Sequence, residues 1–421
     1  MKTVHIIGAG LAGLAAAVRL AGSNIAVGLY ESAGQAGGRC RSFFDKNLGQ
    51  TIDNGNHLLM SGNHSALTYL DEIGTRDSLM GPKRAAYPFV DLMSDERWVV
   101  RPSKGIIPFW ILNANSRVPG TVLGDYMRSL PILWPSADQT VADVIQTSGS
   151  LYKRFWQPLT LAALNTTAER GAARLLRAVL EETFLKGERA CRPLIAREGL
   201  GPSFVSPALK FLEAAGTQVK FNHRLRLLEF SDGRLKQLDF GDAKISVDCD
   251  DMVILAVPSF RMPQIWPSLT APGDGETIVN VHFKLKDPIT PAFGIPILGL
   301  INATAHWAFI RDNMISLTIS AAGNLVDEDS DKLMSLLWNE TRQALRLGNM
   351  EFDAARIIKE KRATFDQSPA GLRRRPSAST AIANLVLAGD WTDTGLPSTI
   401  EGAIRSGHTA ADIVQQRIGQ L

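Results

Sequence analysis

The stretch 51–64, TIDNGNHLLMSGNH, gathers side chains that could do chemistry: one aspartate, several asparagines and two histidines seven residues apart. Asp53 and His57 could transfer a proton, and histidines near a carboxylate could also begin a metal site. A third ligand at a suitable spacing is missing from the sequence, so we expect no metal. His64 follows Asn63, a suitable helix N-cap, and we expect it at a solvated helix start. What Asp53 and His57 do depends on the elements around them.

Residues 3–31 predict the first half of a nucleotide-binding fold. A buried strand runs into G-x-G-x-x-G and an Ala-Leu-rich helix, and a second strand ends at Glu31. The first glycine permits a tight turn, the second lets the backbone approach a pyrophosphate, and the third lets helix and strand pack closely. The pyrophosphate would sit on the helix N-terminus, and the acid would bind a ribose. The residues expected to bind a dinucleotide here are Gly8, Gly10, Leu11, Ala12, Gly13 and Glu31.

A second cofactor motif follows directly. Gly37 and Gly38 allow close backbone approach, and Arg39 could neutralise a diphosphate. The alternative is a surface turn with a solvated arginine, but a Gly-Gly-Arg so soon after the ribose acid is not part of a plain NAD site.

The chain end predicts a third motif, in which a buried strand, 385–388, breaks at Gly389 and Asp390 before a helix. The start of that helix, at Thr399 and Ile400, suits an anion. This pattern resembles the C-terminal flavin motif of FAD-dependent amine oxidases and carotenoid desaturases. The resemblance implies that the aspartate binds the ribityl-diphosphate part of FAD and that the helix N-terminus faces the flavin ring. The three motifs together indicate FAD.

The middle of the chain suits the same superfamily. Segments 218–230 and 250–259 predict strands, and the resemblance implies that Leu225 contacts the adenine through backbone atoms. The expected fold class is α/β: a discontinuous Rossmann-like FAD-binding domain with an inserted α+β substrate domain and a helical membrane-facing part. The expected FAD-binding segments are 1–75, 195–260 and 380–421, and the expected substrate-binding segments are 76–194 and 261–379.

The composition argues against a nucleic-acid-binding, secreted or membrane-spanning protein. The 421 residues carry a net charge of only +3, which argues against a nucleic-acid partner. Three scattered cysteines suit a reducing compartment. No apolar run reaches the roughly 18 residues of a membrane span, and a strand begins at once after Met1-Lys2, so we expect no signal peptide.

Further segments narrow the family. The chain resembles the hydroxysqualene dehydroxylases, FAD enzymes of bacterial hopanoid synthesis, over nearly its whole length. The segments that carry the resemblance are IDNGNHLLMSG, FWQPLTLAALNTTAE, GLGPSF, ATFDQSPAGLRRRP and LAGDWTDTGLPSTIEGAIRSG. Two departures are Asn56, where the family pattern has glutamine, and Cys40, which replaces a small residue.

The resemblance implies reductive dehydroxylation of hydroxysqualene to squalene. The protonated allylic hydroxyl would leave, and hydride from N5 of reduced FAD would reach the allylic cation. Segment 53–58 would then line the isoalloxazine, with Gly55, Asn56, His57 and Leu58 against the ring. His57 is the leading proton donor, although a structural histidine near the ring is an equal alternative. Weaker candidates are Asp53 and Asp393 as acids, and Asn56 and Asn165 as groups that orient the hydroxyl.

The implied substrate is a long hydrocarbon that partitions into a bilayer. Segment 101–135 mixes aromatic, aliphatic and basic residues, which suits docking on a membrane, although a buried helical subdomain is the alternative. The basic run 373–375 could attract anionic lipid or be solvated. Trp156 and 159–164 suit either a substrate tunnel or a helix core. We therefore expect a cytoplasmic protein, peripheral on the inner membrane, which meets hydroxysqualene and possible other enzymes of squalene and hopanoid synthesis.

Other functions on this fold stay open. A carotenoid or phytoene desaturase would reduce FAD with its substrate, and an amine oxidase would need a lysine and an aromatic cage, of which Trp391 could form half. A flavin-bearing lipid carrier without turnover is a third alternative. A second G-x-G-x-x-G for NAD(P)H is missing from the sequence, so we expect electrons from a separate donor.

Overall fold

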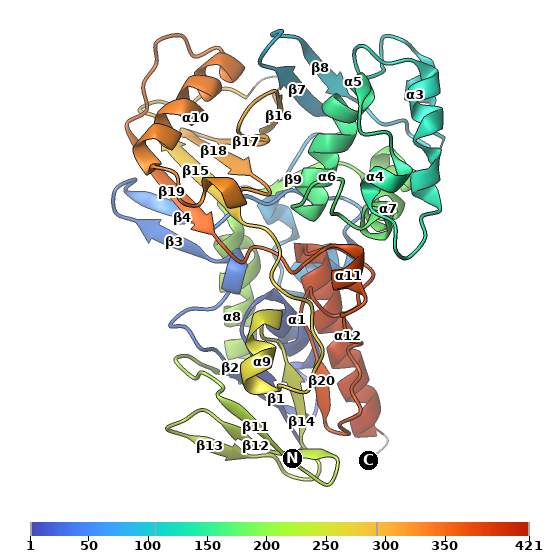
Figure 1. Ribbon diagram of the computed structural model, residues 1–421. Coiled ribbons are helices and arrows are strands. Elements are labelled where there is room, and N and C mark those ends of the chain that lie inside the picture. Colours follow the sequence, from blue (N-terminus) through green and yellow to red (C-terminus); the bar gives the residue numbers. More distant parts are fainter. Residues whose placement is uncertain (1, 106, 292–293, 420–421) are drawn as a thin grey trace.

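The structure is a computed structural model that describes residues 2–105, 107–291 and 294–419. Its lower half in Figure 1 is built on a parallel sheet whose strand order is β10-β2-β1-β14-β20. The apolar runs of these strands follow from their burial on both faces. The strands are β1 (Thr3–Ile7), β2 (Ala26–Tyr30), β10 (Val219–Lys220), β14 (Met252–Leu255) and β20 (Leu385–Leu387).

Helices cover one face of this sheet, and a small antiparallel sheet with a short helix covers the other. The helices on the first face are α1 (Leu11–Leu20), α2 (His64–Glu72), α8 (Ser206–Ala214) and α12 (Ile400–Gly419). The second face carries β11 (Leu227–Ser231), β12 (Arg234–Asp239), β13 (Lys244–Ser246) and α9 (Met262–Ile265). Helices α1 and α12 pack closely because Gly407 has no side chain: a Cβ there would lie 2.2 Å from the Ala12 carbonyl oxygen.

The upper half holds a mixed sheet in the order β19-β15-β18-β17-β16-β7-β8. Most of its pairings are antiparallel, and β16 pairs with β7 in parallel. The strands are β7 (Tyr87–Asp91), β8 (Arg97–Val100), β15 (Ile278–Lys284), β16 (Ile297–Ile301), β17 (Trp307–Arg311), β18 (Met314–Ile319) and β19 (Ala354–Glu360). Helix α10 (Ser330–Leu345) packs on one face through an apolar core.

A group of short helices packs on the opposite face of this mixed sheet, at the upper right of Figure 1. They are α3 (Leu123–Arg128), α4 (Val141–Val144), α5 (Gly149–Leu151), α6 (Gln157–Leu164) and α7 (Ala173–Glu182). A further short helix, α11 (Pro369–Leu372), follows the last strand of the mixed sheet. Segment 101–135 forms the turns η3 (Phe109–Leu112) and η4 (Leu130–Leu133) on either side of α3.

Short strands join the two halves of the molecule. The hairpin β3 (Ser42–Asp45) and β4 (Gln50–Asp53) leads into β5 (Leu59–Met60), which shares β9 (Pro193–Ala196) with β6 (Leu79–Met80). Asp53 accepts a hydrogen bond from the Leu200 N–H, and Asn56 contacts Asn280 of β15. The segment with the predicted chemistry therefore lies between the two sheets.

Helix α2 begins at His64, which is exposed as expected, but its cap differs from the prediction. The Asn63 side chain accepts from the Met60 N–H and caps nothing in the helix. The buried carboxylate of Glu401, in α12, accepts from the free N–H groups at the start of α2 instead. Asn63 therefore holds the predicted N-cap position, but the side-chain acceptor comes from a distant helix.

Candidate active site

The glycine-rich turn leaves an open cradle at the carboxyl end of β1. Gly8 has φ +107°, and a Cβ on Gly13 would lie 1.8 Å from the Gly8 carbonyl oxygen, so both positions need glycine. A Cβ on Gly10 would meet no heavy atom within 4 Å. The N–H groups of Ala12 and Gly13 have no hydrogen-bond partner in the described part of the chain. An anionic diphosphate fits these free donors at the helix N-terminus.

Glu31 lies beside this turn, where β2 ends. Its carboxylate accepts from the Ala9 N–H at 2.8 Å and from the Ala33 N–H at 2.8 Å, so it also fixes the glycine turn. The Glu31 carbonyl accepts from the His223 N–H, and this bond holds the stretch before Leu225 beside the end of β2. The Leu225 side chain is buried, so a group bound outside it would meet its backbone. The contacts with ribose and adenine stay predictions.

Arg39 and Asp390 bring the second and third motifs together. The Arg39 Nη2 lies 2.6 Å from Asp390 Oδ1, and Arg39 also donates to the Ala363 carbonyl. The Arg39 side chain is 38% exposed, whereas that of Asp390 is only 6% exposed. Burial acts to raise the pKa of Asp390, but Arg39 and the Ser398 hydroxyl outweigh it and hold that pKa below its ordinary value. The pair is therefore charged, with the arginine facing outward beside the glycines.

Gly37 and Gly38 place this arginine next to the cradle. Gly37 has φ +102° and donates its N–H to the Ala9 carbonyl at 2.8 Å. A Cβ on Gly38 would lie 3.4 Å from the Gly10 Cα, so the two glycine turns meet. On the other side, Thr399 caps α12 by accepting from the Gly402 N–H. The N–H groups of Thr399 and Ile400 have no partner within the described ranges and could receive a polar cofactor atom.

The loop after Gly389 is held by a residue whose role was predicted wrongly. Arg375 is buried and donates to the carbonyls of Asp390, Thr392 and Leu396. Only its neighbours Arg373 and Arg374 are exposed, and Arg373 pairs with Asp138. The expectation of a basic loop fails for Arg375 because sequence alone does not show which arginine turns inward.

Asp53 is an anchored carboxylate. It is 2% exposed and accepts from Ser42 Oγ at 2.6 Å, from the Leu200 N–H at 2.8 Å and from Arg311 Nη1 at 2.9 Å. These contacts fix the position of segment 53–58.

Asn56 and Gly55 face the mixed sheet. Asn56 Nδ2 donates to Thr318 Oγ1 at 3.2 Å, and its weaker contacts include Asn280 Oδ1 at 3.5 Å. A Cβ on Gly55 would lie 3.2 Å from Asn280 Nδ2, so glycine allows this close approach. Asn280 is 1% exposed, and its Oδ1 also accepts from Thr318 Oγ1 at 2.9 Å. A buried amide and a half-buried amide therefore meet at this point.

His57 is neutral at neutral pH. Burial lowers its pKa to about 4; Asp53 opposes the shift and Arg39 adds to it. Its ring makes no hydrogen bond to the described residues. Leu58, next to it, packs against the apolar core of the upper half. A neutral imidazole can orient a polar group. At neutral pH, however, only a small fraction of the protein would carry the second ring proton that an acid donates.

Asn165 and Trp391, two further candidates from the sequence, have structural roles. Asn165 is buried, with φ +48° at the end of α6, and its amide bonds the Glu276 carbonyl and the Ala321 N–H, each at 2.8 Å. Trp391 is 2% exposed and donates to the Val257 carbonyl, so it belongs to the core and not to an aromatic cage. Trp156 is also buried, with its indole N–H on Ser129. Asp393 is exposed on the loop.

The mixed sheet presents a face that changes from polar to aromatic. Residues opposite each other across strands share a face. In one row the registers align Asn280, Thr318, Trp307, Gly299, Phe89 and Trp98. The polar end meets Asn54 and Asn56, whereas the aromatic end packs on the helices α5–α7.

Sequence reasoning missed the polar end of this row, which includes Asn280, Thr318 and Glu360. A signal was present: polar residues at 280, 282 and 284 alternate with apolar ones along IVNVHFK. Alternation of this kind indicates a strand with one polar face, but it does not say what that face meets.

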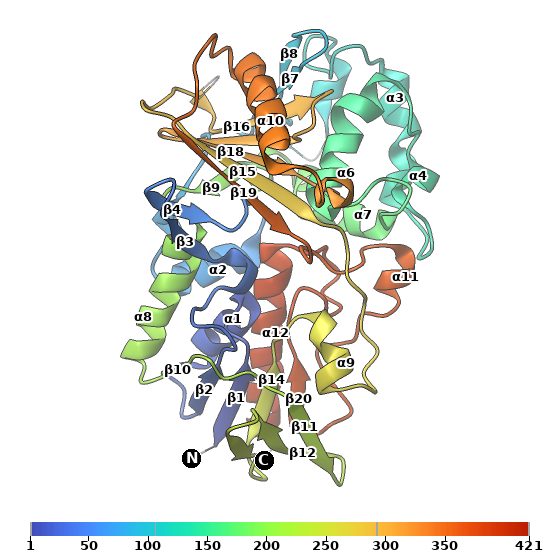
Figure 2. The same cartoon turned by 60° about the vertical axis from the view of Figure 1, so that its left-hand side comes forward.

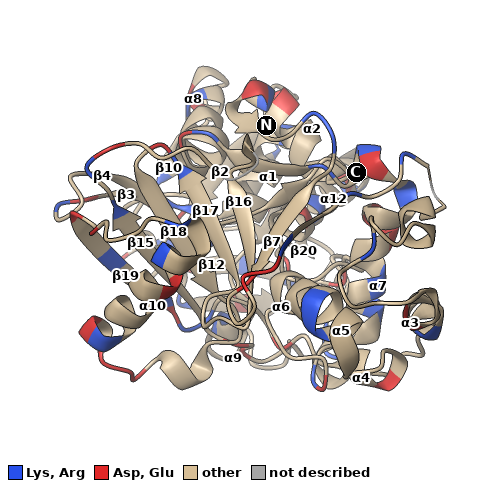
Figure 3. Cartoon of the chain, turned by 90° about the horizontal axis from the view of Figure 1, so that it is seen from above, with Lys and Arg blue, Asp and Glu red and all other residues tan. Residues whose placement is uncertain are grey.

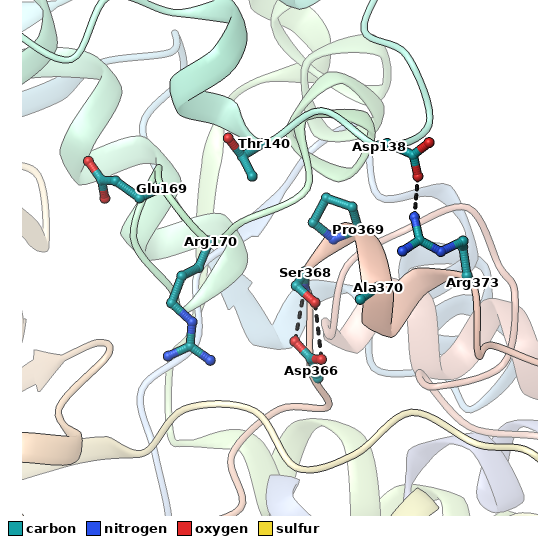
Figure 4. Close-up of a pocket in the computed structure, with 9 residues that line it drawn as sticks. All are labelled: Asp138, Thr140, Glu169, Arg170, Asp366, Ser368, Pro369, Ala370 and Arg373. Atoms are coloured by element: carbon teal, nitrogen blue, oxygen red, sulfur yellow. Dashed lines mark hydrogen bonds and ion pairs between the residues drawn. The ribbon is translucent and has the colours of Figure 1, made fainter.

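An open surface pocket of about 700 Å³ lies elsewhere, between the α6–α7 region and α11 (Figure 4). Its carboxylates come from Asp138, Glu169 and Asp366, and Arg373 crosses to Asp138. It shares no lining residue with the glycine turns or with segment 53–58. The chemistry described above therefore belongs to the junction of the two halves and not to this pocket.

Comparisons with known proteins agree with this arrangement. A family model described as flavin containing amine oxidoreductase matches residues 11–415. The hydroxysqualene dehydroxylase of Rhodopseudomonas palustris is 46% identical over 98% of each chain, and that of Zymomonas mobilis is 42% identical over 98% of this chain and 99% of its own. Cyclohexylamine oxidase from Brevibacterium oxydans shares the fold, with a TM-score of 0.72 at 14% identity over 99% of each chain. The chain belongs to the flavin-containing amine oxidoreductase family and, within it, to the hydroxysqualene dehydroxylases.

Proposed function

We propose that this protein is an FAD-dependent oxidoreductase that converts hydroxysqualene to squalene. The observation that carries the proposal is the identity of 42–46% with hydroxysqualene dehydroxylases along 98% of the chain. Zeta-carotene desaturase of Synechocystis is only 22% identical over 98% of this chain, which favours the reductive reaction over desaturation. The buried position of Trp391 argues against the aromatic cage of an amine oxidase.

The residues at the junction fit FAD. The N–H groups at the starts of α1 and α12 would hold the diphosphate and the ring, and Arg39 with Asp390 would hold the ribityl-diphosphate part. Gly8, Gly10, Gly37 and Gly38 give the backbone room to approach. When bound and reduced, FAD supplies a hydride to the substrate. Segment 55–58 would lie against the ring, since it occupies the gap between the two sheets.

The face of the mixed sheet supports an alcohol on a long hydrocarbon as the substrate. Its amide and hydroxyl groups, at Asn280 and Thr318, could orient a hydroxyl, and His57 in its neutral form could do the same. Beyond them the face turns aromatic at Trp307 and Phe89, which are buried under the helices of the upper half and would back the wall of a hydrocarbon site. The upper half, which contains most of segments 76–194 and 261–379 but not α9, would be the substrate region.

An anaerobic single-turnover assay tests the function. Protein carrying chemically reduced FAD is mixed with hydroxysqualene, and the extract is analysed by gas chromatography–mass spectrometry. Squalene should form in step with the return of the oxidised flavin spectrum. Bleaching of the oxidised enzyme by a carotenoid precursor or an amine, without squalene in the first assay, would refute the proposal in favour of an oxidative relative. Reduction by NADPH alone would refute the separate electron donor that we propose.

We also propose that segment 101–135 docks on an anionic bilayer, which would make the protein peripheral on the inner membrane. Eight of the fifteen exposed large hydrophobic side chains of the described residues lie in this segment, including Phe109 at 58% and Trp134 at 73% exposed. Four basic residues and one acid accompany them: Arg101, Lys104, Arg117, Arg128 and Asp125. From above, basic and acidic ribbon segments are interspersed over the molecule (Figure 3). No helix in the described ranges is long and apolar enough to cross a membrane.

Vesicle sedimentation tests the docking. The double variant Phe109→Ser with Trp134→Ser should bind vesicles of anionic lipid at least about tenfold more weakly, since two large side chains lose their apolar burial. Phe44→Ser removes an equally exposed phenylalanine, at 63%, from the β3–β4 hairpin and serves as the matched control. Equal binding by the double variant and the control would refute the docking surface.

A further inference from the structure

Reductive loss of an alcohol needs a proton on the departing oxygen, because hydroxide is a poor leaving group. This inference rests on the function proposed above. The carboxyl and imidazole groups around segment 53–57 include those of Asp53, His57, Asp390, Glu360 and His282, and burial lowers the pKa of His282 to about 4. These groups differ in how many of their oxygen and nitrogen atoms already have hydrogen-bond partners.

Asp53 and Asp390 each form an ion pair with an arginine side chain. Both oxygens of Asp53 accept hydrogen bonds, one of them from Arg311. Asp390 accepts from Arg39 and from the Ser398 hydroxyl. Each carboxylate would lose a charge-assisted hydrogen bond on protonation. These two groups therefore hold the site together, and transfer of a proton through either would break an ion pair.

His57 is open but neutral. Its pKa of about 4 leaves the imidazole without its second proton at neutral pH, and burial is the main cause. The nearby charges on Asp53 and Arg39 act in opposite directions. It can contact the substrate, but no hydrogen bond among the described residues orients its ring, whereas Asn54 orients the Glu360 carboxyl.

Glu360 ends β19 on the face of the mixed sheet that carries the polar row. It lies opposite Ile278, two residues before Asn280 on β15, so its side chain points to the same side as Asn280. Glu360 Oε2 accepts one hydrogen bond, from Asn54 Nδ2 at 3.1 Å. Within the described ranges Glu360 has no ion pair, and its Oε1 has no hydrogen-bond partner. The half-buried carboxyl thus keeps one oxygen free beside the segment that would line the flavin.

We propose that Glu360 is the catalytic acid that protonates the departing hydroxyl. Oε2 stays on Asn54, and Oε1 carries the proton to the alcohol oxygen. The C–O bond breaks with both electrons on oxygen, and water leaves. The allylic carbon takes a hydride with its two electrons from the reduced cofactor, and the Glu360 carboxylate regains a proton from solvent.

The surrounding charges allow this role. Arg39 is the cation that faces Glu360 from the dinucleotide side, and Asp390 already neutralises it. On the mixed sheet, Lys359 donates to the carbonyls of Val326 and Glu328, and it points away from the site. The neighbours after the strand, Lys361 and Arg362, are exposed, and Arg362 pairs with Asp274.

The test is Glu360→Gln, which keeps an oxygen for Asn54 but has no acidic proton. Single-turnover squalene formation should fall at least about a hundredfold. FAD content, and the change that hydroxysqualene causes in the oxidised flavin spectrum, should stay within about twofold of the parent, which shows intact folding and binding. Glu351→Gln, on an exposed acid paired with Arg342, is the matched control.

A second readout does not depend on turnover. Infrared difference spectra of the oxidised protein with and without hydroxysqualene should contain a carboxylic acid carbonyl band that Glu360→Gln removes. Squalene formation by Glu360→Gln within about fivefold of the parent would overturn the proposal. If the parent itself forms no squalene, the proposed function fails, and the infrared band alone decides whether Glu360 is a hydrogen-bond donor to the alcohol. Absence of the band would overturn it.

Discussion

Replacing Arg375 with lysine should unfold the loop that carries Asp390. The Arg375 guanidinium donates five hydrogen bonds to this loop: to the Thr394 hydroxyl and to the carbonyls of Asp390, Thr392 and Leu396. All three carbonyls belong to buried residues. Lysine keeps the charge but concentrates its donors at one point, so it cannot span the three carbonyls.

The magnitude follows from the carbonyls left without a donor. If the ammonium stays on the Thr392 carbonyl, which Arg375 contacts through two nitrogens, the carbonyls of Asp390 and Leu396 lose their partners at about 1–3 kcal/mol each. The expected loss in the free energy of unfolding is therefore about 2–6 kcal/mol. The affinity for FAD should fall as well, by about tenfold for every 1.4 kcal/mol that the disordered loop must regain on binding.

Urea unfolding of the FAD-free protein and titration with FAD measure the two effects. Arg374→Lys is the control, because Arg374 is exposed and donates only to the Ala271 carbonyl. We expect the control to change stability by less than about 0.5 kcal/mol. If Arg375→Lys matched this control in both assays, the buried guanidinium would not hold the loop and the reasoning would be refuted.

Three further predictions concern other buried polar groups. Burial lowers the pKa of His306 from 6.5 to about 4, and its Nδ1 accepts from the Ser320 N–H, so the unfolded chain takes up the proton first. Stability should fall as the pH drops from about 6.5 to about 4, and His306→Asn should flatten this part of the urea-midpoint profile. Glu401→Ala should cost about 1–3 kcal/mol in urea unfolding, because the first N–H groups of α2 lose their acceptor; a smaller change than in an exposed control would contradict the cap. Asn165→Ala should cost a similar amount but leave FAD content unchanged, since its amide joins α6 to the mixed sheet; loss of FAD would place it in the site instead.

The cofactor-binding motifs could be predicted from the sequence because each is formed by residues that are close together in the chain. A turn between a strand and a helix is specified by neighbouring residues, and Gly8 and Gly13 have the backbone contacts that such a turn requires. The family could be recognised for the same reason, since its segments are short and distinctive. Roles that depend on which side chain faces the protein interior were harder to predict from the sequence, as Arg375 and Asn63 illustrate.

The sequence by itself determined the nucleotide-binding turns, the FAD family and the type of chemistry, because each depends on residues close together in the chain. Only the tertiary structure decided which groups meet segment 53–57. Asn56 meets Asn280 across 224 residues of chain, and Asn54 meets Glu360 across 306. The register of the mixed sheet fixes these meetings, and register follows from how both faces of the sheet are packed, to which every strand contributes.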